Sequence, residues 1–252
     1  MSTNVQSFRV VIADDAVEAG REAGAAAAVA ISDAIRVRGK ARVVFASAPS
    51  QSDMLQELLA TEIDWRSVEA FHMDEYIGID PEDPRAFATW LAERLPVENM
   101  AGFQRINSLG NPKDEAARYE ALLRAEPIDV TLMGFGMNGH IAFNEPGSDL
   151  YDPAFVRTVE LDLASRGQQV VDGLFAHVDD TPTHAISLTV PALLSATKVI
   201  STVVGTHKAR AVQEALHGPI SSECPASAIR RHPDVMLFLD PAAASGLRTK
   251  AA

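Results

Sequence analysis

A glycine-rich loop near the middle of the chain carries the residues whose types and spacing best suit chemistry. The loop runs from Gly134 to Gly147 and reads GFGMNGHIAFNEPG, with His140 and Glu145 close together and Asn138 beside them. A neighbouring carboxylate fixes the tautomer and orientation of an imidazole ring, and a pKa of about 6.5 suits proton transfer in either direction. The loop therefore predicts a proton-transfer unit.

Two further carboxylates, Asp74 and Glu75, directly follow the apolar segment 68–73. A carboxylate that is independent of the histidine can remove a proton from the carbon next to a carbonyl, as the isomerisation of a sugar requires. These residues also have a structural interpretation, because an acidic pair after a strand often forms a turn or caps a helix. An isolated histidine is likewise more often structural than catalytic, so the hypothesis depends on these residues coming together.

The segment from Gly134 to Gly139 also fits the G-x-G-x-x-G pattern of dinucleotide-binding turns. Such a turn must open a helix whose N-terminus holds the pyrophosphate, whereas Pro146 and Gly147 would stop a helix within two turns. We therefore expect the glycines to let backbone N–H groups approach a small ligand closely. A metal site that includes His72 would lack the usual H-x-H or H-E-x-x-H spacing, so neither a metal nor a cofactor is predicted.

The composition narrows the classes of protein to which the chain can belong. Its 252 residues include 22 basic and 34 acidic side chains, a formal charge of −12, and 47% hydrophobic residues, which is typical of a globular fold. The acidic balance argues against a nucleic-acid partner. Cys224 is the single cysteine, which favours a reducing cytoplasm. We see no signal peptide and no run as long as a membrane span, and the sequence leaves a homo-oligomer open.

Short apolar runs alternate with helical patterns along the whole chain. The predicted strands are 9–12, 42–46, 68–73, 128–133, 185–190, 199–204 and 235–239. The predicted helices are 16–38, 52–61, 87–95, 113–125 and 208–216. This alternation predicts one α/β domain over residues 1–252, with a doubly wound, Rossmann-like, mostly parallel sheet and helices on both faces. Ligands of such sheets bind beyond the carboxyl ends of the strands, where the loops 47–51, 74–76, 134–145 and 205–208 fall.

Three segments resemble a known family, the glucosamine-6-phosphate deaminases. The segments 71–80 (FHMDEYIGID) and 132–150 (LMGFGMNGHIAFNEPGSDL) are similar to its two signatures, and 203–240 is similar to its C-terminal part. The resemblance implies an aldose–ketose isomerisation of an amino sugar phosphate with loss of ammonia, from glucosamine-6-phosphate to fructose-6-phosphate, without a cofactor. By matching positions, it implies that Asp74 moves the proton between C2 and C1. His140 would open the pyranose ring, helped by Glu145 and Asn138.

The expected substrate-binding shell departs from the family pattern. The loop after the second strand reads ASAPSQS, without the glycines of the family's usual T-G-G-T. By ungapped count, the position of an arginine in the family pattern corresponds to Gln169 here. Arg166, one helical turn earlier, is a candidate substitute for that arginine. These departures leave open which amino sugar is bound and whether it is phosphorylated. The residues expected to contact the substrate are Ser47, Ser50, Gln51, Gly134 and Lys208, of which Lys208 matches the family's phosphate lysine.

Two other functions compete with the deaminase hypothesis. A lactonase acting on a phosphorylated sugar lactone would use His140 to activate water and would not need Asp74. The related 6-phosphogluconolactonases typically carry D-G-H-T-A-S where this chain has the sequence N-G-H-I-A-F. A non-catalytic sugar-phosphate sensor would normally bring a basic helix-turn-helix, and nothing in the sequence resembles one.

Overall fold

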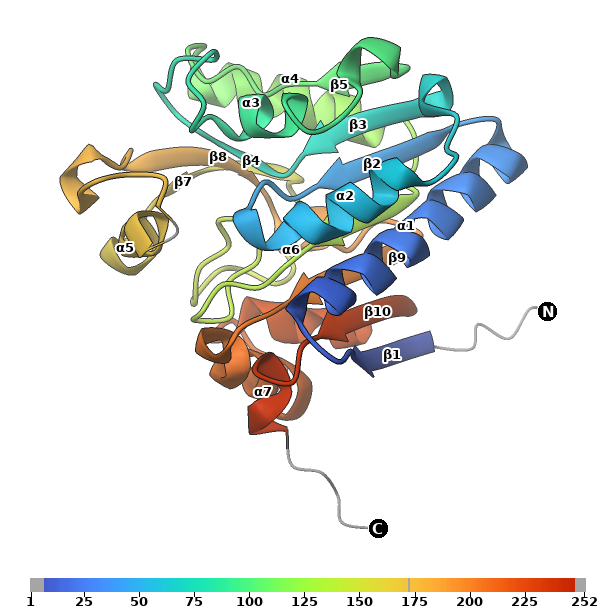
Figure 1. Cartoon of the computed structure of the whole chain (residues 1–252). Coiled ribbons are helices and arrows are strands. Elements are labelled where there is room, and N and C mark those ends of the chain that lie inside the picture. The colour runs from blue at the N-terminus through green and yellow to red at the C-terminus, as the bar shows by residue number, and fades with distance from the viewer. Residues whose placement is uncertain (1–6, 172, 248–252) are drawn as a thin grey trace.

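The computed structural model describes residues 7–171 and 173–247, and its centre is a sheet of parallel strands (Figure 1). In spatial order the strands are β1 (Ser7–Ile12), β10 (Asp234–Leu239), β9 (Lys198–Val203), β6 (Val130–Met133), β2 (Ala41–Phe45), β3 (Val68–His72) and β5 (Gly102–Gln104). Neighbouring strands all pair in parallel. From β2 the chain adds β3 and β5 on one side, and from β6 it adds β9 and β10 on the other. The predicted doubly wound parallel sheet is confirmed.

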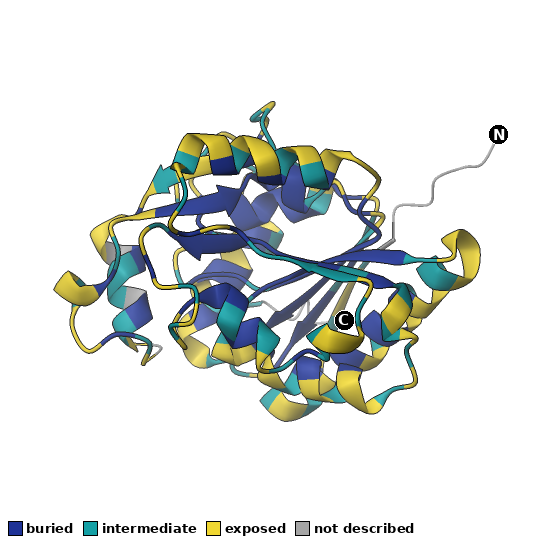
Figure 2. Cartoon of the chain, turned by 90° about the horizontal axis from the view of Figure 1, so that it is seen from above, coloured by how far each residue is buried: buried dark blue, intermediate teal, exposed yellow. Residues whose placement is uncertain are grey.

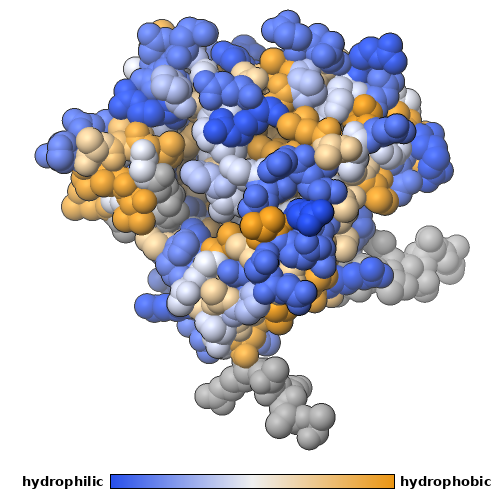
Figure 3. Space-filling model, in the orientation of Figure 1, coloured by the Kyte–Doolittle hydropathy of each residue, from blue (hydrophilic) through white to orange (hydrophobic). Residues whose placement is uncertain are grey.

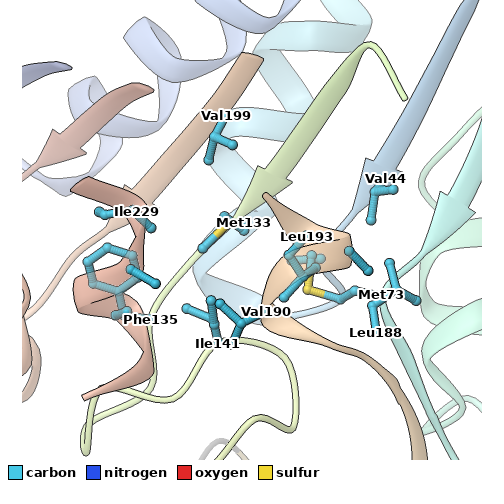
Figure 4. Close-up of a cluster of buried hydrophobic side chains, with 14 of the residues drawn as sticks. Val44, Met73, Met133, Phe135, Ile141, Leu188, Val190, Leu193, Val199 and Ile229 are labelled. Atoms are coloured by element: carbon cyan, nitrogen blue, oxygen red, sulfur yellow. The ribbon is translucent and has the colours of Figure 1, made fainter. Parts of the chain in front are cut away.

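Helices cover both faces of the sheet, as predicted. Alternate residues of β2 point to opposite faces, so that Val43 and Phe45 belong to one buried cluster and Val44 to another. Figure 4 shows part of the second cluster, and Figure 2 shows the strands buried between the two layers of helices. On the Val43 side lie α1 (Ala16–Arg38), α2 (Ser52–Ala60) and α3 (Phe87–Ala92). On the Val44 side lie α4 (Pro112–Arg124), α6 (Val190–Leu193) and α7 (Ala209–His217).

The first helix begins and ends where its sequence indicates. Asp15 caps the N-terminus of α1 by accepting the N–H of Glu18 at 2.8 Å. Gly39 ends the helix in the left-handed conformation, with a φ of 77° that favours glycine. The predicted helix 16–38 is therefore confirmed, and the other predicted helices lie within a few residues of their expected bounds.

A second, antiparallel sheet lies beside the first, and the sequence did not predict it. It contains β4 (Asp74–Tyr76), β8 (His184–Leu188) and β7 (Val156–Glu160). The predicted strand 185–190 is thus a strand, but it lies outside the parallel sheet in which we expected it. β7 was missed because its residues are mostly exposed and polar, and β4 is only three residues long.

The surface is mostly polar on the face that Figure 3 shows, with apolar side chains gathered over α5 (Leu163–Val171). Leu163 and Val171 are 73% and 75% exposed there. None of the described helices combines the length and the apolar character that a membrane span needs.

Candidate active site

A cavity of about 390 Å³ lies at the carboxyl ends of the central strands. β2 and β6 are neighbours from which the chain departs in opposite directions, and this arrangement leaves a crevice beyond their ends. The cavity brings together predicted residues from four separate loops. Those that line it are Ser47, Ser50, Gln51, Asp74, Gly134, His140 and Lys208. Asn138 and Glu145 do not line the cavity themselves but contact His140, which does.

Asp74 enters the cavity at the point where the chain passes from the parallel sheet to the antiparallel one. It is the first residue of β4, pairs with Ser187 of β8 and is 7% exposed. Burial, and then the neighbouring charge of Glu75, raise the pKa of Asp74 to about 8. A carboxylate with a raised pKa is a stronger base, and its pKa is close to the pH at which proton transfer must operate.

Glu75 points away from the cavity and caps a helix. Its carboxylate accepts the backbone N–H groups of Tyr76, Phe87 and Ala88 at 3.0, 3.1 and 2.9 Å. Burial raises the pKa of Glu75 to about 7, although these three hydrogen bonds act to lower it. The structural interpretation of the acidic pair is therefore right for Glu75, which joins β4 to the start of α3.

Replacing Glu75 with glutamine should change the pH dependence of the reaction that Asp74 supports. Burial is the main cause of the raised pKa of Asp74, and the negative charge of Glu75 adds to it. The substitution removes that charge, so the pKa of Asp74 should fall. Because Asp74 acts as a base when ionised, the acidic limb of a plot of kcat/KM against pH should move to lower pH. The matched control is Glu126→Gln, because the Glu126 carboxylate pairs with Lys40 just before β2 begins, away from the cavity. This variant should leave the acidic limb in place.

His140 is supported by a carboxylate and an amide from its own loop. Its Nδ1 lies 3.3 Å from Glu145 Oε1, within ion-pair distance. Asn138 donates from Nδ2 to Glu145 Oε2 at 2.7 Å, and its Oδ1 accepts the backbone N–H of His140 at 3.0 Å. Ser165 of α5, which the sequence analysis did not single out, also donates to Glu145 Oε1.

The surroundings of Glu145 keep it ionised. Burial acts to raise the pKa of Glu145, but the adjacent His140 ring and the hydrogen bonds from Ser165 and Asn138 outweigh it and lower that pKa. An ionised Glu145 stabilises the positive charge that His140 acquires when it takes up a proton. The predicted arrangement of histidine and carboxylate is therefore present, with a serine and an asparagine holding the carboxylate.

One glycine of the glycine-rich loop makes room for a side chain of the same loop. A Cβ atom on Gly136 would lie 2.2 Å from Cε1 of His140, so only glycine leaves room for the ring. The backbone N–H of Gly136 donates to the carbonyl of His140 at 2.8 Å and closes the turn. No helix begins within residues 134–155, as expected. Gly136 thus makes room for the His140 ring. Gly134 and Gly136 also line the cavity, and the close approach of a ligand to their backbone stays a prediction.

The loop after β2 uses several of its polar groups internally. The Ser47 hydroxyl donates to the carbonyl of Phe87 at 3.2 Å. Gln51 is fully buried, and its Nε2 donates to Ser50 Oγ and to the carbonyl of Thr202, both at 3.3 Å. Its Oε1 has no hydrogen-bond partner among the described residues. These contacts order the loop, and Ser47, Ser50 and Gln51 all line the cavity.

Lys208 carries the permanent positive charge of the cavity. It is 7% exposed, and no arginine occurs among the described residues that line the cavity. Gln169 lines the cavity, and its Oε1 accepts the hydroxyl of Tyr76 at 2.8 Å. Arg166, considered as a substitute for the family's arginine, donates instead to the carbonyl of Val178 at 2.6 Å. The structure therefore gives no support to that substitution.

A second acidic residue of the cavity, Asp240, was not predicted from the sequence. Its Oδ1 accepts the N–H groups of Gly205 and Ala243 at 3.0 and 2.8 Å, and so fixes the loop that leads to Lys208. Its place directly after the predicted strand 235–239 is a signal that could have identified it. Apolar side chains complete the lining, namely Met73, Phe87, Phe135, Phe143 and Leu174.

Comparisons with known proteins agree on one family. Residues 14–237 match the family model described as glucosamine-6-phosphate isomerases/6-phosphogluconolactonase. The chain is 35% identical to a glucosamine-6-phosphate deaminase of Exiguobacterium sibiricum over 208 residues, covering 82% of this chain and 81% of that one. It is 30% identical to a glucosamine-6-phosphate deaminase of Lactobacillus delbrueckii subsp. bulgaricus over 245 residues, covering 96% and 100%.

Solved structures extend the likeness to the fold. A monomeric glucosamine-6-phosphate deaminase superposes with a TM-score of 0.86 at 25% identity, over 94% of this chain and 99% of that one. A 6-phosphogluconolactonase from Shewanella baltica superposes with a TM-score of 0.75 at 19% identity, over 93% and 97%. The second likeness concerns the fold alone.

Proposed function

This chain belongs to the family of glucosamine-6-phosphate isomerases and 6-phosphogluconolactonases, and from this premise we propose that it converts glucosamine-6-phosphate into fructose-6-phosphate and ammonia. The observation that carries the proposal is the meeting of two independent proton-transfer groups in one cavity. Asp74 is the first residue of β4, where the chain passes between the two sheets. His140, which pairs with Glu145, belongs to the glycine-rich loop. Isomerisation needs both groups, since ring opening and enolisation move different protons.

The proposed reaction follows from the chemistry of a 2-amino aldose. His140 moves a proton between the hydroxyl and the ring oxygen, which opens the pyranose to the free aldehyde. Asp74, as the carboxylate, removes the proton from C2 and returns it to C1. The product is an imine at C2, and hydrolysis of this imine by one water gives the ketose and ammonia. Lys208 binds the phosphate, because it supplies the permanent positive charge of the cavity.

The proposal is tested by measuring ammonia release from glucosamine-6-phosphate, with galactosamine-6-phosphate and unphosphorylated glucosamine as parallel substrates. We expect ammonia and fructose-6-phosphate in equal amounts. Hydrolysis of 6-phosphogluconolactone without ammonia release from any amino sugar would replace the proposal with the lactonase function. Binding of the amino sugar phosphate without turnover of any of these compounds would favour the sensor.

Gln169 is expected to set how strongly a phosphorylated substrate is preferred. It lines the cavity as a neutral amide, so Gln169→Arg would add a second positive charge to the cavity that Lys208 also lines. We expect the ratio of kcat/KM for glucosamine-6-phosphate to kcat/KM for glucosamine to rise about 10-fold, equivalent to about 1.4 kcal/mol of added anion binding. Gln169→Met is the neutral control. An unchanged ratio in Gln169→Arg would show that the phosphate does not reach this residue.

The proposed substrate also suggests where the protein works. A sugar phosphate is charged at neutral pH and does not cross a lipid bilayer unaided, so we propose that the enzyme acts in the cytoplasm, where its substrate is made or delivered. A single cysteine in the sequence is in keeping with a reducing compartment.

A further inference from the structure

A buried histidine stands behind Asp74, and the reaction proposed above does not use it. His72 is the last residue of β3 and is fully buried. Its Nδ1 lies 2.8 Å from the backbone carbonyl of Asp74, two residues along the chain. The backbone N–H of Ile106 donates to its Nε2 at 2.9 Å. Both ring nitrogens are therefore engaged with backbone groups, which excludes His72 as the metal ligand considered from the sequence.

These contacts determine the protonation of the ring. Because Nε2 accepts from Ile106, the ring proton is on Nδ1, and Nδ1 donates to the carbonyl of Asp74. Burial lowers the pKa of His72 to about 4, so the ring is neutral near pH 7 and keeps this tautomer. At neutral pH His72 therefore keeps both hydrogen bonds, to the carbonyl of Asp74 and from the N–H of Ile106, and does not exchange protons with the cavity. We call this pair of hydrogen bonds the His72 bracket.

The His72 bracket lies where the chain passes from the parallel sheet to the antiparallel sheet. β3 ends at His72, β4 begins at Asp74, and the one residue between them, Met73, accepts the N–H of Leu188 at 2.8 Å. The hydroxyl of Tyr119 holds the other side of His72, accepting its N–H at 3.0 Å and donating to its carbonyl at 2.8 Å. A short segment that changes sheets lacks the continuous ladder that normally fixes a strand, so these side chains fix it instead.

We propose that His72 is a positioning residue for Asp74, and that its Nδ1–H bond to the Asp74 carbonyl holds the carboxylate in the cavity at the angle that proton transfer requires. The inference rests on the proposed function in assigning a catalytic role to Asp74. It adds that the geometry of this base depends on a side chain that never touches the substrate. A displacement of about 1 Å at a reacting group can cost about 10²-fold in rate.

Three substitutions of His72 distinguish the role of Nδ1 from that of Nε2. His72→Asn keeps a donor close to the position of Nδ1, His72→Gln keeps an acceptor close to the position of Nε2, and His72→Phe keeps only the aromatic bulk that lies 6.0 Å from the rings of Phe103 and Tyr119. We expect kcat to fall at least about 10-fold in the Gln and Phe variants with KM nearly unchanged, whereas Asn should stay within about 3-fold of the parent. Ile31→Ala, a buried position on α1 that does not contact the cavity, controls for a general loss of stability.

A second measurement does not depend on turnover. The titration of Asp74, followed by carboxyl NMR, should move toward the ordinary aspartate pKa in the Gln and Phe variants, because a released β4 lets water reach the carboxylate. The Asn variant should titrate like the parent. Equal kcat values and equal titrations in the Asn and Gln variants would overturn the inference. If the parent protein releases no ammonia, the proposed function fails, and the titration alone still decides the role of His72.

Discussion

The substitution Asp74→Asn should abolish turnover while leaving the fold intact. General base catalysis by a positioned carboxylate typically contributes about 10²- to 10⁴-fold, so kcat for ammonia release should fall by at least this factor. Asparagine has nearly the same shape but cannot accept the C2 proton. The fold should survive because burial disfavours the ionised form of this side chain, and a neutral amide avoids that cost.

The control for this variant is Asp33→Asn, which replaces an exposed carboxylate paired with Arg36 on α1. Both variants should unfold at nearly the same temperature as the parent, and Asp33→Asn should keep full activity. Turnover above a tenth of the parental kcat in Asp74→Asn would refute the assignment of Asp74 as the base. It would agree instead with the lactonase hypothesis, in which this residue is dispensable.

The substitution Lys208→Met should weaken the binding of a phosphorylated substrate selectively. Hydrogen bonds to charged groups contribute about 1.5–3 kcal/mol, so kcat/KM for glucosamine-6-phosphate should fall by up to about 100-fold. Methionine keeps most of the buried aliphatic stem of the lysine, which limits the effect on packing. For unphosphorylated glucosamine, kcat/KM should be nearly unchanged.

Lys113→Met serves as the control because Lys113 is exposed on α4. It removes one positive charge from the protein without changing the cavity, so it separates a local effect from that of net charge. An equal loss of kcat/KM for the phosphorylated and unphosphorylated sugars in Lys208→Met would contradict the assignment. It would show that Lys208 orders its loop and does not bind the phosphate.

The sequence predicted the location of the site because the alternation of strands and helices determines it. Parallel strands all end on one edge, so Asp74, His140 and Lys208, far apart in the chain, could be expected at the same crevice. Pro146 and Gly147 also predicted, correctly, that no helix follows the glycine-rich turn.

Other features depend on contacts that no local pattern encodes. The antiparallel sheet consists of strands of three to five residues, and periodicity is weak over so few positions. Gln169 faces the cavity because Tyr76 holds its amide oxygen. The His72 bracket likewise depends on Ile106, which is 34 residues away.

The path of the C2 proton tests the central claim most directly. Glucosamine-6-phosphate carrying deuterium at C2 should react more slowly than the unlabelled sugar, and part of the label should appear at C1 of the fructose-6-phosphate formed, because one carboxylate, Asp74, removes and returns it. Asp74→Asn should abolish both the product and the transfer of label. Release of ammonia at the same rate from both sugars, with an aldose product that keeps its deuterium at C2, would contradict this role of Asp74.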